Sequence, residues 1–124
     1  MSRIVLVEDN EKNMKLARDI LTFKGHTVYE ATTGEAAVET ATRELPDLVL
    51  MDIQLPGIDG IEALRRIRID GQAARIPVVA LTASVMADDR ERFDKAGFDG
   101  FIAKPIDVKS FATQVAALIA KGRS

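Results

Sequence analysis

The sequence predicts an α/β protein in which five parallel strands form one sheet with helices on both of its faces. Apolar runs of strand length alternate with helical patterns five times along the chain. Three runs, at residues 4–7, 48–51 and 78–81, are continuously apolar, as is typical of strands buried on both faces. Short strand–helix connections favour right-handed crossovers, and these produce a doubly wound parallel sheet.

Two further strands complete the predicted sheet. Residues 27–31 mix polar with apolar side chains, a pattern that favours a strand at the edge of the sheet. Residues 100–103 form a short fifth run.

The first predicted helix covers about residues 10–24. Leu16, Ala17, Ile20 and Leu21 repeat at helical spacing and predict its buried face, and Gly25 stands where a left-handed residue ends a helix.

The other helices carry starting signals of their own. Thr32 with Glu35, and Asp59 with Glu62, have the spacing of capping boxes. Asp107 is placed to cap the last helix, whose apolar stripe runs from residue 108 to 119. Residues 87–96 predict the weakest helix, because Phe93 is the only large apolar side chain among many charges.

Length and composition set further bounds. The chain has 124 residues, of which 47% are hydrophobic and 29% charged, so we expect residues 1–124 to be one folded domain without an output domain. Lys plus Arg is 17 and Asp plus Glu is 19, giving a net charge of −2. That balance lacks the basic excess of a nucleic-acid binder.

Several site chemistries are excluded by residue counts. There is no cysteine and one histidine, His26, so thiolate catalysis, Cys-based metal sites and multi-histidine metal sites are absent. No apolar run approaches the roughly 18–20 residues of a membrane span. The first apolar run is also shorter than the about 7–15 residues of a signal peptide. We therefore expect a cytoplasmic protein without membrane contact.

Polar side chains follow four of the five predicted strands. Glu8 and Asp9 follow the first strand, Asp52 the third, Thr82 the fourth and Lys104 the fifth. In an open parallel sheet, ligands bind beyond the carboxyl ends of the strands. These side chains are therefore expected to converge on one end of the sheet.

Each of these residues also has an ordinary structural explanation. Glu8 or Asp9 could cap a helix, Asp52 could open a turn, Thr82 could act as a cap and Lys104 could be a solvated charge. Their shared position at strand ends is what favours a functional site.

The predicted cluster suits one kind of chemistry. Carboxylates held together repel one another, and a bound cation relieves that repulsion. Oxygen ligands without nitrogen or sulfur suit Mg²⁺. A carboxylate can also act as a nucleophile and form an aspartyl phosphate, and phosphoryl transfer depends mainly on neutralising charge.

Five motifs together resemble the receiver domains of response regulators, especially the stand-alone DivK type. They are Glu8-Asp9-Asn10, residues 50–56 (Leu-Met-Asp-Ile-Gln-Leu-Pro), Gly60, Leu81-Thr82-Ala83 and Lys104-Pro105. The resemblance covers almost the whole chain and implies a flavodoxin-like (βα)5 fold with strand order 2-1-3-4-5. It also implies a cis peptide bond between Lys104 and Pro105.

The resemblance implies a phosphoacceptor and a Mg²⁺ site. Asp52 is the implied phosphoacceptor. Asp9 and Asp52 are implied as direct ligands of Mg²⁺, with Glu8 binding directly or through water and the backbone carbonyl of Gln54 adding a further ligand.

The phosphoryl group has its own implied partners. Lys104 pairs with it, while Thr82 donates its hydroxyl and Ala83 its amide. Phe101 stands where the family has its switch aromatic, which is often tyrosine. Because phenylalanine lacks the phenol oxygen, packing has to carry the switch here.

The implied function is signalling by phosphorylation in a two-component system or phosphorelay. A sensor histidine kinase or a histidine phosphotransfer protein donates the phosphoryl group to Asp52. The added charge of about −1.5 to −2 draws Thr82 inward and lets Phe101 follow, which repacks the face made by the helix at 87–96, the strand at 100–103 and the last helix. That face binds a downstream protein or a second copy of the chain, and the protein is a phosphoacceptor rather than an enzyme.

Three alternatives remain open from the sequence. The first is a degenerate receiver that is never phosphorylated and acts only by binding proteins. The second is a Mg²⁺-dependent phosphatase with an aspartyl nucleophile, but such enzymes commonly need a second carboxylate two residues on, where this chain has Gln54. The third is a nucleotide- or flavin-binding domain, although neither glycine-rich phosphate motif is present.

One basic cluster lies outside these motifs. Arg65, Arg66, Arg68 and Arg75 are close in sequence, and we interpret them as a solvated helix face rather than a nucleic-acid contact.

Overall fold

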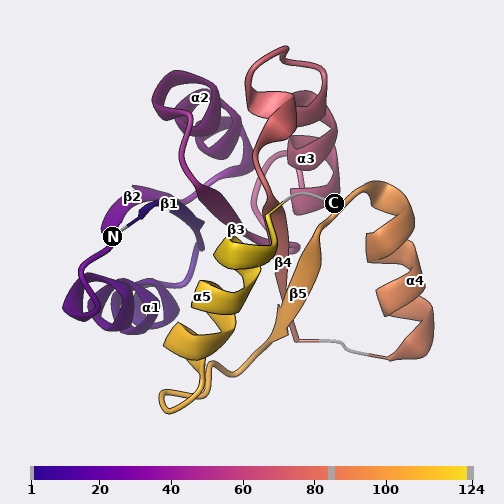
Figure 1. Ribbon diagram of the computed structural model, residues 1–124. Coiled ribbons are helices and arrows are strands. Elements are labelled where there is room, and N and C mark those ends of the chain that lie inside the picture. The colour runs from indigo at the N-terminus through magenta and orange to yellow at the C-terminus, as the bar shows by residue number, and fades with distance from the viewer. Residues whose placement is uncertain (1, 84–85, 123–124) are drawn as a thin grey trace.

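The computed structural model describes residues 2–83 and 86–122 and contains the predicted five-stranded parallel sheet (Figure 1). The strands are β1 (Arg3–Val7), β2 (Thr27–Ala31), β3 (Leu48–Asp52), β4 (Val78–Thr82) and β5 (Gly100–Ala103). Their order is β2-β1-β3-β4-β5, which confirms the order implied by the family resemblance. β2 lies at an edge of the sheet, as its mixed pattern predicts.

Helices connect the strands in the predicted alternation. They are α1 (Glu11–Phe23), α2 (Gly34–Glu44), α3 (Gly60–Arg68), α4 (Ala87–Ala96) and α5 (Phe111–Lys121), with a short 3-10 turn η1 (Ala73–Arg75) before β4. No helix in the described ranges is long and apolar enough to cross a bilayer.

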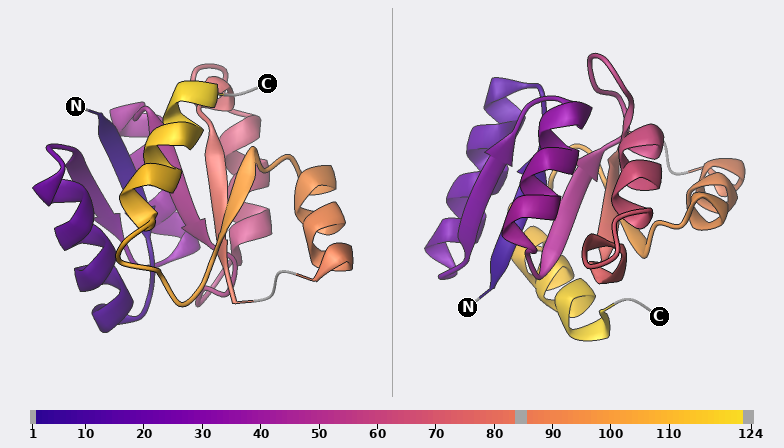
Figure 2. Two further views of the ribbon diagram at one scale, coloured as in Figure 1. Left: turned by 60° about the horizontal axis from the view of Figure 1, so that its bottom comes forward. Right: turned by 90° about the horizontal axis from the view of Figure 1, so that it is seen from above.

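The sheet separates two hydrophobic clusters. Alternate residues of the central strands point to opposite faces, so Val5 and Val49 pack with α2, α3 and Phe93 of α4, while Leu6 and Leu50 pack with α1 and α5. Figure 2 shows α5 on the opposite side of the sheet from α2 and α3. Covering both faces explains the continuously apolar sequence of these strands.

The start of α2 differs from the predicted capping box by one residue. Thr33, not Thr32, is the N-cap, and its side chain accepts a hydrogen bond from the backbone N–H of Ala36. At α3 the prediction is right for the cap itself, because Asp59 accepts from the N–H of Glu62 at 2.9 Å. Glu62 does not complete the box and instead pairs with Arg65 and Arg66.

The sequence predicts that Asp107 caps α5, but the N-cap position is occupied by Ser110. Its carboxylate accepts hydrogen bonds from the N–H of Lys109 and the hydroxyl of Ser110. These bonds build a turn before the helix, which begins at Phe111. Val108, predicted as part of the apolar stripe, lies in this turn and is exposed.

The buried face of α1 is also shifted from the prediction. Met14, Ala17 and Leu21 are buried, whereas Leu16 is exposed. The predicted end of the helix is confirmed, because Gly25 has φ +90°, a conformation that side chains rarely adopt.

The interpretation of the basic cluster as a solvated helix face is wrong for Arg68. Its side chain is largely buried and forms an ion pair of 2.9 Å with buried Asp99. It also donates to the carbonyls of Ile76 and Gly97. Arg65 and Arg66 do lie on the exposed face, where they pair with Glu62.

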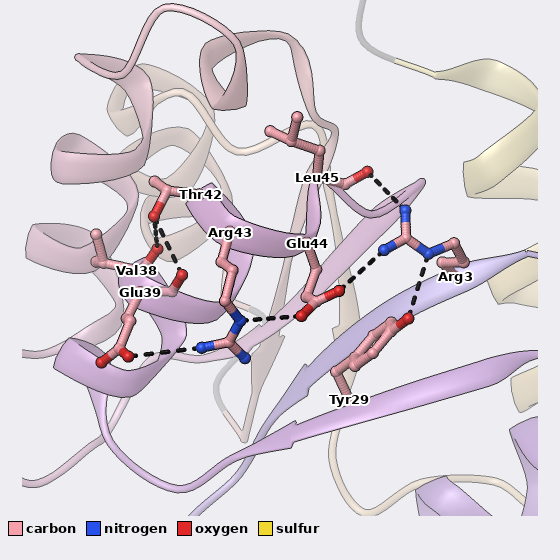
Figure 3. A network of polar contacts seen from close by, with 8 residues as sticks. All are labelled: Arg3, Tyr29, Val38, Glu39, Thr42, Arg43, Glu44 and Leu45. Carbon is pink, nitrogen blue, oxygen red and sulfur yellow. Dashed lines mark hydrogen bonds and ion pairs between the residues drawn. The ribbon is translucent and has the colours of Figure 1, made fainter.

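A polar network holds α2 against the starts of the first strands (Figure 3). Arg3 donates to the Tyr29 hydroxyl at 3.3 Å and to the Glu44 carboxylate at 3.1 Å. Glu44 also accepts from Arg43 at 2.9 Å. These bonds fix the end of the sheet opposite to the carboxyl ends of the strands.

Candidate functional site

The carboxyl ends of the strands bring the predicted residues together. Asp52 is the last residue of β3 and Thr82 the last of β4, and Asp52 pairs in register with Leu81, the neighbour of Thr82. Lys104 follows β5, and its N–H donates to the carbonyl of Thr82 at 2.8 Å. Both β4 and β5 end at the bottom of Figure 1.

Glu8 and Asp9 reach the same place from β1. The N–H of Glu8 continues the sheet by donating to the carbonyl of Ala31 at 3.0 Å. The Glu8 carboxylate accepts from the N–H of Asn10. Asn10 is the N-cap of α1, so the capping role considered for Glu8 and Asp9 belongs to the next residue.

Three carboxylates meet at this end of the sheet. One oxygen from each of Glu8, Asp9 and Asp52 lies within 4.8 Å of the other two. Glu8 and Asp52 are buried, whereas Asp9 is exposed. One bound cation at such a cluster can contact all three groups.

Lys104 balances part of this negative charge. Its ammonium lies 2.8 Å from an oxygen of Asp52 and 2.8 Å from an oxygen of Glu8. Its peptide bond to Pro105 is cis, which confirms the expectation from the resemblance.

Burial and charge shift the proton affinities of two of these groups. Burial, followed by the neighbouring Asp52 carboxyl, raises the pKa of Glu8 above its ordinary value. Burial opposes the charged form of Lys104, but its hydrogen bonds to Asp52 and Glu8 outweigh this effect and raise the pKa of Lys104. Glu8 and Lys104 therefore both bind their protons more tightly here than they would in water.

The donor set fits a magnesium ion. All of the clustered side-chain ligands are carboxylate oxygens, which Mg²⁺ prefers. Asp9 is exposed and opens the cluster to solvent, so water can complete the coordination, as Mg²⁺ usually requires.

Gly60 fixes the position of the Asp52 peptide. Its N–H donates to the carbonyl of Ile53 at 3.0 Å. A Cβ atom at residue 60 would lie only 2.5 Å from the Asp52 carbonyl oxygen. The start of α3 can therefore pack this closely against the end of β3 only with glycine.

The clustered residues line one cavity of about 330 Å³. Seven of the eight residues singled out from the sequence line it: Glu8, Asp9, Asp52, Gln54, Thr82, Ala83 and Lys104. The N–H of Gln54 donates to the Asp52 carboxylate at 3.0 Å, which orients that side chain.

Three further polar residues line the same cavity: Asn10, which was named from the sequence only as part of a motif, and Asn13 and Arg92, which sequence reasoning missed. Asn10 and Asn13 lie at the start of α1, and Arg92 comes from α4. The spacing of Asn10 and Asn13 directly after Glu8-Asp9 could have indicated the first two. Arg92 gave no such signal, because it stands among the many charges of α4.

Phe101 lies apart from this cavity. It is half-buried on β5, packs against the cluster that contains Phe93, and lines a separate cavity of about 400 Å³. The guanidinium of Arg90 lies 4.8 Å from its ring centroid. The ring is thus held at the surface between β5 and α4.

A sheet of this order, with carboxylates and a lysine at its carboxyl end, is the architecture of a receiver domain. Residues 4–116 match the family model of the response regulator receiver domain. The chain belongs to this family, whose members are signalling proteins of two-component systems.

Curated relatives of the chain are response regulators of the same family, named DivK. The chain is 42% identical over 108 residues to the polar-differentiation response regulator DivK of Brucella anthropi. The match covers 87% of this chain and 88% of that protein. DivK of Brucella ovis matches to the same extent.

Solved structures are similar over nearly the whole chain. The receiver domain of the sensor histidine kinase PA1611 from Pseudomonas aeruginosa PAO1 has a TM-score of 0.87 and 35% identity, over 96% of this chain and 98% of that one. Its structure contains a magnesium ion coordinated in the active site cleft. The chemotaxis response regulator CheY4 of Vibrio cholerae, at 20% identity, has a TM-score of 0.90 over 95% of this chain and 98% of that one, which shows the shared fold.

Proposed function

We propose that the protein accepts a phosphoryl group on Asp52 and transmits this event to a protein partner. The observation that carries the proposal is the position of Lys104, which lies 2.8 Å from Asp52 and from Glu8 within a cluster of three carboxylates. Phosphoryl transfer needs positive charge that neutralises the phosphoryl group, and Lys104 together with a cation bound by the carboxylates would supply it. Family membership and the DivK relatives support the same function.

The proposed reaction uses a phosphohistidine donor. A carboxylate oxygen of Asp52 attacks the phosphorus, a new O–P bond forms, and the P–N bond breaks with its electron pair going to the departing imidazole. Hydrolysis later resets the protein, when water attacks the phosphorus, releases inorganic phosphate and restores the carboxylate. The donor is a sensor histidine kinase or a histidine phosphotransfer protein.

Mg²⁺ is the proposed cofactor and supplies positive charge to the transferring phosphoryl group. Asp9, Asp52, Glu8 and the backbone carbonyl of Gln54 hold it. The magnesium ion in the cleft of the PA1611 receiver domain supports this assignment, as do the all-oxygen ligands of the cluster.

The phosphoryl oxygens are proposed to bind three groups. The Thr82 hydroxyl and the Ala83 N–H donate hydrogen bonds, and Lys104 supplies an ammonium. All three line the cavity that contains Asp52.

The proposed output is a change in the face made by α4, β5 and α5. Thr82 ends β4 beside β5, where it pairs in register with Ala103. Movement of Thr82 toward the phosphoryl group gives Phe101 room to turn inward from the surface. A downstream protein target, or a second copy of the chain, then recognises the changed face.

We also propose that the protein acts as a cytoplasmic, single-domain regulator and not as a turnover enzyme. The DivK relatives, matched over 88% of their length, support a regulator of this extent. Gln54 in place of a second carboxylate supports the role of phosphoacceptor over that of a phosphatase.

Phosphorylation by a panel of purified histidine kinases and by acetyl phosphate tests the proposal. The wild type is expected to take up label only with Mg²⁺, and Asp52→Asn is expected to take up none because it lacks the nucleophilic oxygen. Asp9→Asn should lose most of the Mg²⁺ response, since an anionic carboxylate ligand becomes a neutral amide. A wild type that binds Mg²⁺ but never takes up label would instead indicate the degenerate receiver.

A further inference from the structure

Arg92 reaches the proposed phosphorylation cavity from an element outside the predicted motifs. It lies on α4 and lines the same cavity as Asp52, Thr82 and Lys104. The other groups of this cavity come from the strand ends and the start of α1. Arg92 therefore places a second cation at the cavity, on the side of α4.

The backbone of Arg92 is held in place by its neighbour, whereas its guanidinium makes only a weak ion pair. Phe93, the next residue, is buried and packs edge-on against Phe98 with ring centroids 6.0 Å apart. The Arg92 guanidinium lies 5.2 Å from the Phe93 ring centroid and 3.9 Å from the Asp89 carboxylate, which is beyond hydrogen-bonding distance. The side chain is 58% exposed, so it can turn toward a new anion at little cost.

The charges of the cavity leave a role for this guanidinium. A phosphoryl group on Asp52 carries about −1.5 to −2 charge on three acceptor oxygens, in place of the single negative charge of the carboxylate. Lys104, the other cation that lines the cavity in the described ranges, already contacts both Glu8 and Asp52 at 2.8 Å. A planar guanidinium offers paired N–H donors that match phosphoryl oxygens.

We propose that Arg92 is a further phosphoryl-binding residue, which contacts the anion on Asp52 and attracts the anionic donor group to it. This inference rests on the proposed function, because it assumes that Asp52 carries the phosphoryl group. Arg92 acts on the phosphoryl anion and not on the divalent cation.

The test uses the full chain and beryllofluoride, an anion that mimics a phosphoryl group on a carboxylate. Its affinity is measured by calorimetry in saturating Mg²⁺ for the wild type, Arg92→Gln, Arg92→Lys and Lys95→Gln. Lys95 is the matched control, because it removes one positive charge from the same helix at a residue that pairs with Glu91 and does not line the cavity.

Arg92→Gln is expected to weaken beryllofluoride binding by about tenfold, the scale of one partly exposed charge-assisted hydrogen bond. The beryllofluoride affinity of Arg92→Lys should lie between those of Arg92→Gln and the wild type. The affinity of Lys95→Gln should stay within about twofold of the wild-type value. With acetyl phosphate as donor, Arg92→Gln should show a raised KM.

Mg²⁺ affinity without the anion separates the proposed role from damage to the fold. Arg92→Gln should bind Mg²⁺ at least as tightly as the wild type, because a nearby cation has been removed. Equal beryllofluoride affinities for Arg92→Gln and Lys95→Gln would overturn the role of Arg92 alone. A wild type that binds Mg²⁺ but not beryllofluoride would overturn the proposed function itself.

Discussion

Glu8 is a buried carboxyl group whose neighbours are the Asp52 carboxyl, the Lys104 ammonium and the backbone N–H of Asn10. Burial raises its pKa, and the ion pair with Lys104 compensates only part of that effect. A buried acid of this kind is costly in a protein that needs it only for packing. Its position beside Asp52 indicates that the site holds negative charge for a cation.

Glu8 makes the stability of the metal-free protein depend on pH. A group whose pKa is higher in the folded state contributes stability that is fully present below its unfolded value, near 4.5, and is lost as pH rises through the folded value. Glu8→Gln cannot ionise, so the wild type should lose stability relative to this variant over that range. Urea unfolding of both proteins without Mg²⁺ measures the difference, and a constant difference from acid to neutral pH would show that the pKa of Glu8 is not raised by folding.

At the scale of residues, the sequence predicted most of the cavity but not all of it. Asp52 and Thr82 could be found because each directly follows an apolar run, so their place at the sheet end is set by the strand pattern. Arg92 could not, because a charged residue on a charge-rich helix has no feature that separates it from a solvated one. Only the packing of α4 decides which of its charges face the cavity.

At the scale of elements, Arg68 and Asp99 join the end of α3 to the starts of β4 and β5. Arg68 ends α3 and binds the carbonyl of Ile76 before β4, while Asp99 precedes β5 and accepts from the N–H of Val78 at 2.9 Å. Both side chains are largely buried. This contact fixes the positions of the first residues of β4 and β5. Thr82 lies at the opposite end of β4, and Lys104 follows the opposite end of β5.

Arg68→Ala should therefore destabilise the protein much more than a neighbouring substitution. It leaves the Asp99 carboxylate buried without this partner, which should lower the free energy of unfolding by about 2–4 kcal/mol. Arg66→Ala removes an arginine of the same helix whose exposed side chain pairs with Glu62, and its effect should stay within about 0.5 kcal/mol. Chemical denaturation compares the two, and similar losses for both would argue against a structural role for the buried ion pair.

The errors in the predicted elements have local causes. Thr32 and Thr33 are both good N-cap residues, and spacing to Glu35 favoured the wrong one. Asp107 has the right chemistry for a cap, but its side chain is used by Lys109 and Ser110 in the turn before α5. Sequence pattern locates a helix more reliably than it locates the first residue of the helix.

At the scale of the whole molecule, the topology explains why distant residues form one site. A parallel sheet places all carboxyl ends of its strands at one end, so residues 8, 52, 82 and 104 meet although up to 96 residues separate them in sequence. The alternation of strands and helices was predictable from the apolar pattern. The strand order was not, because the pattern does not say which strands are neighbours, and it came from the resemblance to the family.

In the proposed reaction, the carboxyl group of residue 52 receives the phosphoryl group. Borohydride reduces an acyl phosphate and leaves a stable mark on the acceptor residue. Protein labelled with acetyl phosphate in Mg²⁺ is therefore reduced and mapped by peptide mass spectrometry. The reduced residue is expected to be Asp52, whereas a mark on Asp9 or Glu8, with Asp52 unmodified, would contradict this.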